Sequence, residues 1–133
     1  MNTLFKTMLF ASFALAAAAA NADVVVIVSS KSTATTMTAD DIANIYLGKS
    51  TAMKPVDNAT PIRAQFYTAV AGKDEAQVKA IWSKLVFTGK ATPPKELPSS
   101  AEVVKAVAAD SNAIGYVDKT AVDGSVKVVY EVK

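Results

Sequence analysis

Runs of apolar residues alternate with polar, turn-rich segments along this chain, and the longest runs have the character of strands. Val24–Val28 is an unbroken series of β-branched residues, which is typical of a strand covered on both faces. Ala113–Val117 and Val126–Val132 are also expected to be strands, and a further short strand is expected near Met53–Val56. These segments predict a small sheet.

Four other segments show the spacing of three and four residues that gives a helix one apolar face. The first is Ala39–Leu47, with Thr38 as its N-cap and Gly48 as its stop. The second has Thr60 as its N-cap and Pro61 at the first helical position. The stripes predicted to be apolar faces are Ile42, Ile45 and Tyr46 in the first helix and Ile62, Phe66, Ala69 and Val70 in the second.

The last two helices begin with capping-box pairs, in which the N-cap and the third helical residue bond each other's backbone. Asp74 with Gln77 starts the third helix, and Ser99 with Glu102 starts the fourth. Between them Ala91–Pro98 is expected to be extended, because its prolines do not fit a helix. The apolar positions are Val78, Ile81, Trp82, Leu85 and Val86 in the third helix and Val103, Val104, Val107 and Ala108 in the fourth. The whole pattern predicts an α/β domain, a small mixed sheet covered by about four helices.

The N-terminal segment has the features of a secretory signal peptide. A short basic start precedes the apolar run Thr7–Ala20, which is too short to span a membrane comfortably. Small residues then form a cleavage site, so cleavage is expected between Ala22 and Asp23. The predicted organisation is a signal peptide at residues 1–22 and one periplasmic domain at residues 23–133, with no later membrane span. An uncleaved anchor is the alternative.

The composition limits the chemistry that the chain can perform. Cysteine and histidine are both absent, which excludes Ser-His-Asp and Cys-His hydrolases and removes the commonest zinc ligand. Helix starts account for most of the prominent carboxylates, and no pair of them suggests a metal or catalytic site. A net charge of +2 gives no basic surface for nucleic acid. We therefore expect a protein that is not an enzyme, needs no cofactor or metal and does not bind nucleic acid.

Several segments resemble one family of transport proteins. Thr38–Lys49, TADDIANIYLGK, resembles the helix that opens the second lobe of phosphate ABC-transporter substrate-binding proteins. Ala113–Val117 is similar to that family's Ala-Ile-Gly-Tyr-Val strand. Ile62–Val70 and Lys79–Leu97 resemble a group of short exported proteins that consist of this lobe only. The resemblance implies a single lobe of a type 2 periplasmic-binding-protein-like fold. Full-length members hold their ligand between two lobes, and this chain has room for one.

The phosphate loop of that family is altered in this sequence. The family's loop is Arg-x-Asp-Gly-Ser-Gly-Thr, and alignment through Arg63 and Phe66 places Asn58–Ile62 on its last five residues. Pro61 then removes a backbone N–H donor, and the family's arginine falls on Val56. Tight phosphate binding by this chain alone is therefore not expected.

Two groups of residues remain candidates for weak binding of phosphate or another oxyanion. One is Thr60 with Arg63 at the start of the second helix, and the other is the hydroxyl-rich loop Ser29–Thr33, with Ser29, Ser30 and Lys31 as its candidate ligands. The alternatives are a salt-bridged surface arginine and an ordinary polar loop. Two functions follow: an exported, non-catalytic solute-binding-protein-like module, or a periplasmic interaction module that has lost its ligand. The second would dock to an envelope protein through the surface Phe87–Pro98 or a sheet edge.

Overall fold

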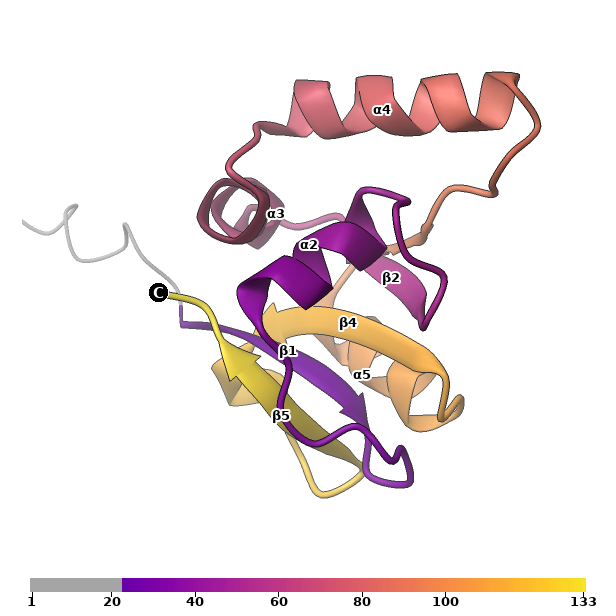
Figure 1. The fold of residues 1–133 in the computed structure, drawn as a ribbon. Helices are drawn as coiled ribbons and strands as arrows, with labels where there is room; N and C mark the ends of the chain where they lie inside the picture. The colour runs from indigo at the N-terminus through magenta and orange to yellow at the C-terminus, as the bar shows by residue number, and fades with distance from the viewer. Residues whose placement is uncertain (1–22) are drawn as a thin grey trace, which may run out of the picture.

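A computed structural model describes residues 23–133, which form a mixed α/β structure (Figure 1). The predicted signal peptide and most of its cleavage site lie outside the described residues. In chain order the elements are β1 (Val24–Ser29), α2 (Ala39–Tyr46), β2 (Lys54–Asn58), α3 (Ile62–Phe66), the π-helix η1 (Tyr67–Ala71), α4 (Glu75–Phe87), β3 (Lys95–Leu97), α5 (Ser100–Ala108), β4 (Ala113–Asp118), the 3₁₀ turn η2 (Lys119–Ala121) and β5 (Val126–Glu131).

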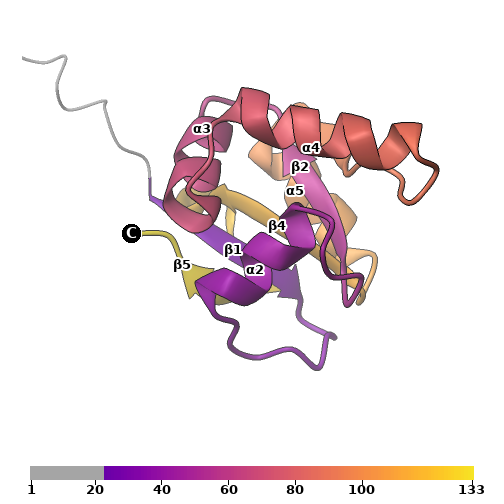
Figure 2. The same ribbon diagram turned by 45° about the horizontal axis from the view of Figure 1, so that its top comes forward.

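The five strands form one mixed sheet in the order β3-β2-β4-β1-β5. β1 runs antiparallel to both β4 and β5, whereas β2 runs parallel to both β3 and β4. Helix α5 covers one face of the sheet, α2 and α3 cover the other, and α4 is the outermost element on that side (Figures 1 and 2). The predicted small mixed sheet with four helices is confirmed.

The place of β1 between two strands and two helical layers explains its continuous hydrophobic run. Successive side chains of a strand point to opposite faces. Val24, Val26 and Val28 therefore pack with α2 and α3, while Val25 and Ile27 pack with α5. All five are at most 1% exposed.

The helix starts follow the local sequence closely. Thr38 with Asp41 and Asp74 with Gln77 form reciprocal capping boxes, as predicted. Ser99 accepts a bond from the backbone of Glu102, but no reciprocal bond completes that box. These bonds are between near neighbours, so each satisfies otherwise unpaired backbone groups without help from the rest of the fold.

Several sequence-based expectations for the second and third helices are wrong in detail. Pro61, not Thr60, is the N-cap of α3, and no side chain caps that helix. The π-helical turn changes the helical register after Phe66, so Tyr67 is buried and Ala69 is exposed. On α4 the apolar stripe is only partly covered, because Val86 is 45% exposed.

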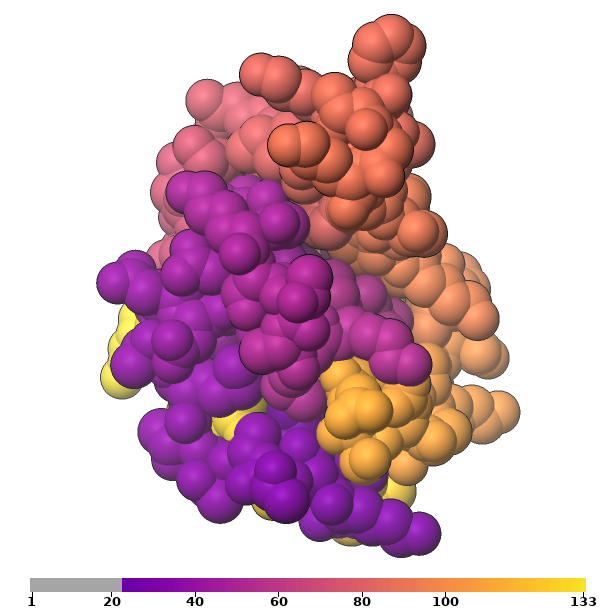
Figure 3. Space-filling model, turned by 45° about the vertical axis from the view of Figure 1, so that its right-hand side comes forward, coloured from indigo at the N-terminus to yellow at the C-terminus, as the bar shows by residue number. Residues whose placement is uncertain are grey.

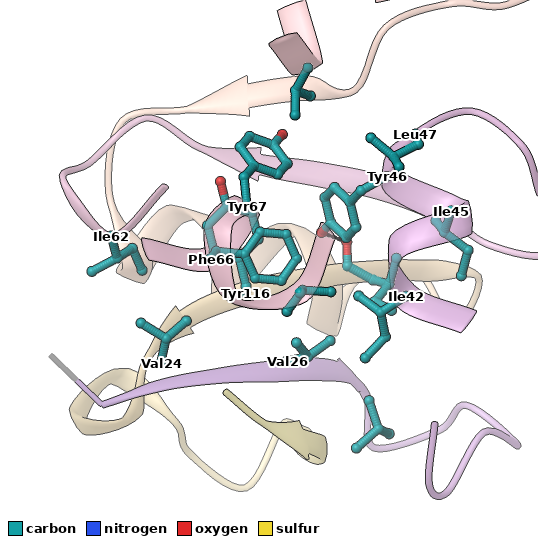
Figure 4. Packing of buried hydrophobic residues seen from close by; sticks show 14 of the residues in the cluster. Val24, Val26, Ile42, Ile45, Tyr46, Leu47, Ile62, Phe66, Tyr67 and Tyr116 are labelled. Atoms are coloured by element: carbon teal, nitrogen blue, oxygen red, sulfur yellow. Dashed lines mark hydrogen bonds between the residues drawn. The ribbon is translucent and has the colours of Figure 1, made fainter. Parts of the chain in front are cut away.

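A cluster of four aromatic rings occupies the space between the sheet and helices α2 and α3 (Figure 4). Phe66 stacks on Tyr116 with ring centroids 3.8 Å apart and planes at 5°. Tyr46 meets Phe66 edge-on at 4.9 Å, and Tyr67 lies 5.4 Å from Phe66. The Tyr46 hydroxyl also lies 2.8 Å from the carbonyl of Val56, so the cluster contacts the backbone of β2.

Candidate functional site: a carboxylate cluster around Arg63

The structure separates the two groups of candidate residues. β1 and β2 point in opposite directions, because one is antiparallel and the other parallel to β4. The loop after β1 therefore leaves one end of the sheet, and the loop after β2 leaves the other end. Ser29, Ser30 and Lys31 do not share a site with Thr60 and Arg63. The rule that ligand loops gather at the carboxyl ends of strands holds for parallel strands, and this sheet is mixed.

At the first of these ends, Ser29 has a structural role. Its side chain is almost fully buried, and its Oγ accepts a hydrogen bond from the backbone N–H of Lys31 at 3.1 Å. The same Oγ lies 3.4 Å from the carbonyl of Ala108 at the end of α5. Ser30 and Lys31 are exposed to solvent. This end of the sheet therefore offers exposed polar groups at Ser30 and Lys31, whereas the hydroxyl of Ser29 is occupied by bonds within the fold.

At the other end, Arg63 lies among three carboxylates. Its Nε bonds Glu75 at 2.7 Å and its Nη1 bonds Glu96 at 3.0 Å. Its Nη1 is also 3.5 Å from Oδ2 of Asp57. The three partners come from β2, α4 and β3, so one arginine ties three elements together. Thr60 lies beside this cluster in the chain, but its contribution is a backbone carbonyl that accepts from the N–H of Arg63 at 3.0 Å.

Asp57 is the buried member of this carboxylate cluster. Only 8% of the residue is exposed, and its Oδ1 accepts from the backbone N–H of Asn58 at 3.0 Å. The hydroxyl of Tyr116 donates a short hydrogen bond to the same oxygen. A buried carboxylate needs such partners, because an unpaired charge away from water is strongly destabilised.

The pKa values of the cluster follow from burial and charge. Burial, followed by the nearby negative charge of Asp57, raises the pKa of Tyr67 and of Tyr116 well above that of a free tyrosine. Partial burial acts to lower the pKa of Arg63, but hydrogen bonds to Glu75 and Glu96 outweigh it and raise that pKa. Arg63 is therefore a permanent cation and the two tyrosines stay neutral at physiological pH.

A cleft of about 670 Å³ opens beside this cluster, between α4 and the segment that contains Pro93 and Pro94. Trp82 lies on its apolar wall, and Phe87 stands at its rim. A cleft of this size can hold a small molecule or a protruding side chain. Its charged lining comprises Asp57, Glu75 and Glu96 against Arg63 and Lys79, so the cleft is acidic.

Sequence reasoning identified Arg63 but not the acidic residues around it. Glu96 is 33 positions from Arg63 in the chain, and Glu75 was explained by its place at a helix start. The only local signal was the cation in the first turn of a helix, where it is disfavoured by the helix dipole and needs a negative partner. The chain supplies that partner itself.

Neither a membrane span nor a metal-binding group was found in the part of the chain that the structure describes. Within residues 23–133, no helix is long and apolar enough to cross a membrane. Over the same residues, no group of three or more His, Cys, Asp or Glu side chains is placed to hold a metal ion.

The sheet and its helical layers have the arrangement of one lobe of a periplasmic-binding-protein fold. Three solved structures are similar to it. A protein from Clostridium perfringens, assigned as a phosphate ABC transporter substrate-binding protein and solved with bound phosphate, is 21% identical with a TM-score of 0.65. An ABC-type phosphate transport receptor from Vibrio cholerae is 16% identical with a TM-score of 0.64. PstS from Borrelia burgdorferi is 12% identical with a TM-score of 0.61.

These similarities cover most of this chain but less than half of each neighbour. They include 81%, 81% and 82% of this chain, and 44%, 46% and 47% of the three neighbours. No protein-family model and no curated protein sequence matches the chain. The chain therefore has the fold of a single lobe of a phosphate ABC transporter substrate-binding protein.

Proposed function

We propose that this protein is an exported, non-catalytic module with a solute-binding-protein-like fold that acts through protein contacts rather than by tight capture of phosphate. The fold supports the first part, because the three neighbours are a substrate-binding protein, a transport receptor and PstS. The second part rests on the surroundings of Arg63.

The observation that carries the proposal is that the positive charge of Arg63 is already neutralised. Three carboxylates lie within 3.5 Å of its guanidinium. An entering anion has to displace at least one of them and still meets the others. Two like charges 4 Å apart repel by about 4 kcal/mol at an effective dielectric constant of 20. A single arginine in this setting is therefore a poor anion site.

Export of the chain is supported by the sequence of residues 1–22. Their apolar run and small-residue cleavage site are those of a signal peptide, which directs a protein to the periplasm. The test is the mass of the protein recovered from a periplasmic fraction, which we expect to begin at Asp23. A mass that retains residues 1–22 would show an uncleaved anchor instead.

A second candidate function is weak binding of phosphate or another oxyanion. It is favoured by the bound phosphate of the Clostridium perfringens neighbour. Its candidate ligands are Thr60 with Arg63 at one end of the sheet and Ser29, Ser30 and Lys31 at the other. Because the two groups are separated, one ion would contact only one group, and affinity would be low.

Calorimetric titration with phosphate and sulfate separates the two functions. We expect no binding heat up to about 10 mM anion, a concentration at which even a site of only about 3 kcal/mol is detectable. The double variant Glu75→Gln with Glu96→Gln keeps the shape of both side chains and releases Arg63, so weak phosphate binding should appear in it. Lys119→Ala, an exposed lysine at η2, is the control. Submillimolar binding by the unmodified protein that is lost in Arg63→Ala would overturn the proposal.

A further inference from the structure

Helix α4 exposes apolar surface that the rest of residues 23–133 does not cover. Of its thirteen residues only Val78 and Trp82 are buried. At its C-terminal end Val86 is 45% exposed and Phe87 is 92% exposed. In the space-filling view the end of α4 and the loop after it project from the top of the molecule (Figure 3). An almost fully exposed phenylalanine beside a cleft is a typical anchor for a protein contact.

Two clefts meet beneath this helix, and their charges are opposite. The acidic cleft, described above, contains Asp57, Glu75 and Glu96. A second cleft of about 630 Å³, the basic cleft, contains Lys54, Lys90 and Lys95 with a single acidic residue, Asp110. Both clefts are lined by Trp82, Pro93 and Pro94. The surface around α4 thus has an apolar centre with negative charge on one side and positive charge on the other.

The charges are also arranged along the axis of α4. Glu75 opens the helix and belongs to the acidic cleft, whereas Lys90 lies just beyond the last helical residue and belongs to the basic cleft. In a two-fold contact, if one residue of the first copy contacts a different residue of the second copy, the same pair also forms with the two copies exchanged. Two antiparallel α4 helices would therefore bring each Glu75 toward the partner's Lys90.

The side-chain sizes fit the same arrangement. Ala76 lies at the N-terminal end of α4 and lines the acidic cleft, and Phe87 is the last residue of the helix. Antiparallel pairing sets the bulky end of one helix against the small residue of the other. Phe87 then leaves solvent and enters an acidic cleft whose apolar wall includes Trp82 and Pro93. Burial of an exposed phenylalanine favours association at each end of the contact.

We propose that two copies of this chain associate through antiparallel α4 helices, with Phe87 of each copy in the acidic cleft of the other. The inference rests on the proposed function, because it names a second copy of the chain as the partner of the Phe87–Pro98 surface. The described residues correspond to less than half of each solved neighbour, and the dimer sets two such lobes side by side.

Sedimentation velocity of the purified protein over roughly 1–200 µM tests the association, since this range spans dissociation constants typical of small interfaces. We expect a shift from monomer to dimer with rising concentration. The emission of Trp82, the single tryptophan of the chain, should change over the same range because it lines the buried cleft. Phe87→Ser should weaken the dimer at least tenfold. Val128→Ser is the matched control, because Val128 is an exposed valine on β5.

Charge reversal tests the orientation of the two helices. Glu75→Lys and Lys90→Glu should each weaken self-association, because each places like charges together. A mixture of the two variants should associate more strongly than either variant alone, since each copy then supplies the charge that the other has lost. A merely structural role of Glu75 in holding Arg63 would not produce this recovery.

Three results would overturn the inference. One is a monomer at all concentrations, and another is a dimer that Phe87→Ser leaves unchanged. The third is a monomer that binds phosphatidylglycerol vesicles through Phe87 and the nearby lysines, which would make the surface a membrane contact. None of these results bears on the phosphate titration, so failure of the dimer and failure of the proposed function can be told apart.

Discussion

The sheet and helix α4 differ in how completely their apolar residues are buried. In the sheet, all six residues of β1 are buried, and Tyr116 of β4 stacks with the ring of Phe66 from α3 at 3.8 Å. Helix α4 buries only Val78 and Trp82. Its specific bonds are those of Trp82, whose Nε1 donates to the carbonyl of Tyr46 at 2.7 Å, and of Glu75, which pairs with Arg63. The first region is closely packed, and the second is joined to it by a few specific contacts.

The residues that stabilise the fold and the residues of the proposed contact surface therefore lie mostly in different regions of the molecule. Buried apolar area supplies most of the free energy of folding. In this protein most of it lies between the sheet and helices α2, α3 and α5, and α4 adds Val78 and Trp82. The exposed side chains of Val86 and Phe87 and the contrast of charge lie around α4. Substitutions in the sheet should therefore change stability, and substitutions at the exposed end of α4 should change association.

The largest effect is expected for Phe66→Ala. Phe66 is fully buried, and its ring contacts Tyr46, Tyr67 and Tyr116. Removing the ring leaves a cavity inside a rigid cluster, so the free energy of unfolding should fall by about 3–5 kcal/mol. Urea unfolding followed by circular dichroism measures it. A loss below 1 kcal/mol would mean that the cluster relaxes and that the sheet is not the closely packed region.

Alkaline pH should destabilise the same cluster. Burial comes first among the causes that raise the pKa of Tyr46, Tyr67 and Tyr116. The pKa of each tyrosine in the folded protein lies above its pKa of about 10 in the unfolded chain. The neutral tyrosines therefore stabilise the fold fully below pH 10, and this stabilisation is lost as the pH rises further. The free energy of unfolding should then fall by up to roughly 4 kcal/mol per pH unit, because each of the three tyrosines contributes about 1.4 kcal/mol per pH unit.

The measurement is urea unfolding between about pH 9 and 11, a range that lies on both sides of the tyrosine pKa in the unfolded chain. Tyr67→Phe removes one of the three titrating groups and should reduce the slope by about one third. Tyrosinate absorbance at 295 nm that rises in the folded protein as it does in the urea-unfolded protein would contradict the prediction.

Gly115→Ala should have the next largest effect, because α5 lies against β4 at this glycine. A Cβ atom at Gly115 would stand 2.6 Å from Cγ1 of Val103 and 2.9 Å from Cγ2 of Val107. The helix has to move or the valines have to leave their rotamers, which typically costs about 1–3 kcal/mol. Gly124→Ala is the control, since nothing lies within 4 Å of a Cβ there. Equal unfolding midpoints for the two variants would show that the α5 layer adjusts freely.

Much of the fold could be predicted because it depends on local patterns. The β-branched run of β1 and the capping pairs of α2 and α4 are read from neighbouring residues, and each lies where it was expected. β3 was expected only as extended chain. This segment is a strand because it pairs in parallel with β2, with Asp57 opposite Glu96.

The candidate site was harder to predict because it depends on strand direction and on distant residues. A loop after β1 and a loop after β2 appear equivalent in the sequence, yet they lie at opposite ends of a mixed sheet. Likewise, the cation of Arg63 suggests an anion ligand until Glu96, from another strand, is placed 3.0 Å away. No local pattern contains either fact.

The smallest effect on stability is expected for Phe87→Ser. Phe87 is 92% exposed, so in the monomer its loss should change the free energy of unfolding by less than about 0.5 kcal/mol. Trp82→Phe, five residues earlier on the same helix, is the matched comparison. It deletes the bond to the carbonyl of Tyr46 and leaves a buried acceptor unpaired, which costs about 1–3 kcal/mol. Both are measured by urea unfolding at a concentration where the protein is monomeric. If Phe87→Ser proved as destabilising as Trp82→Phe, the end of α4 would belong to the closely packed region, and its exposed phenylalanine would not be free to bind a second copy.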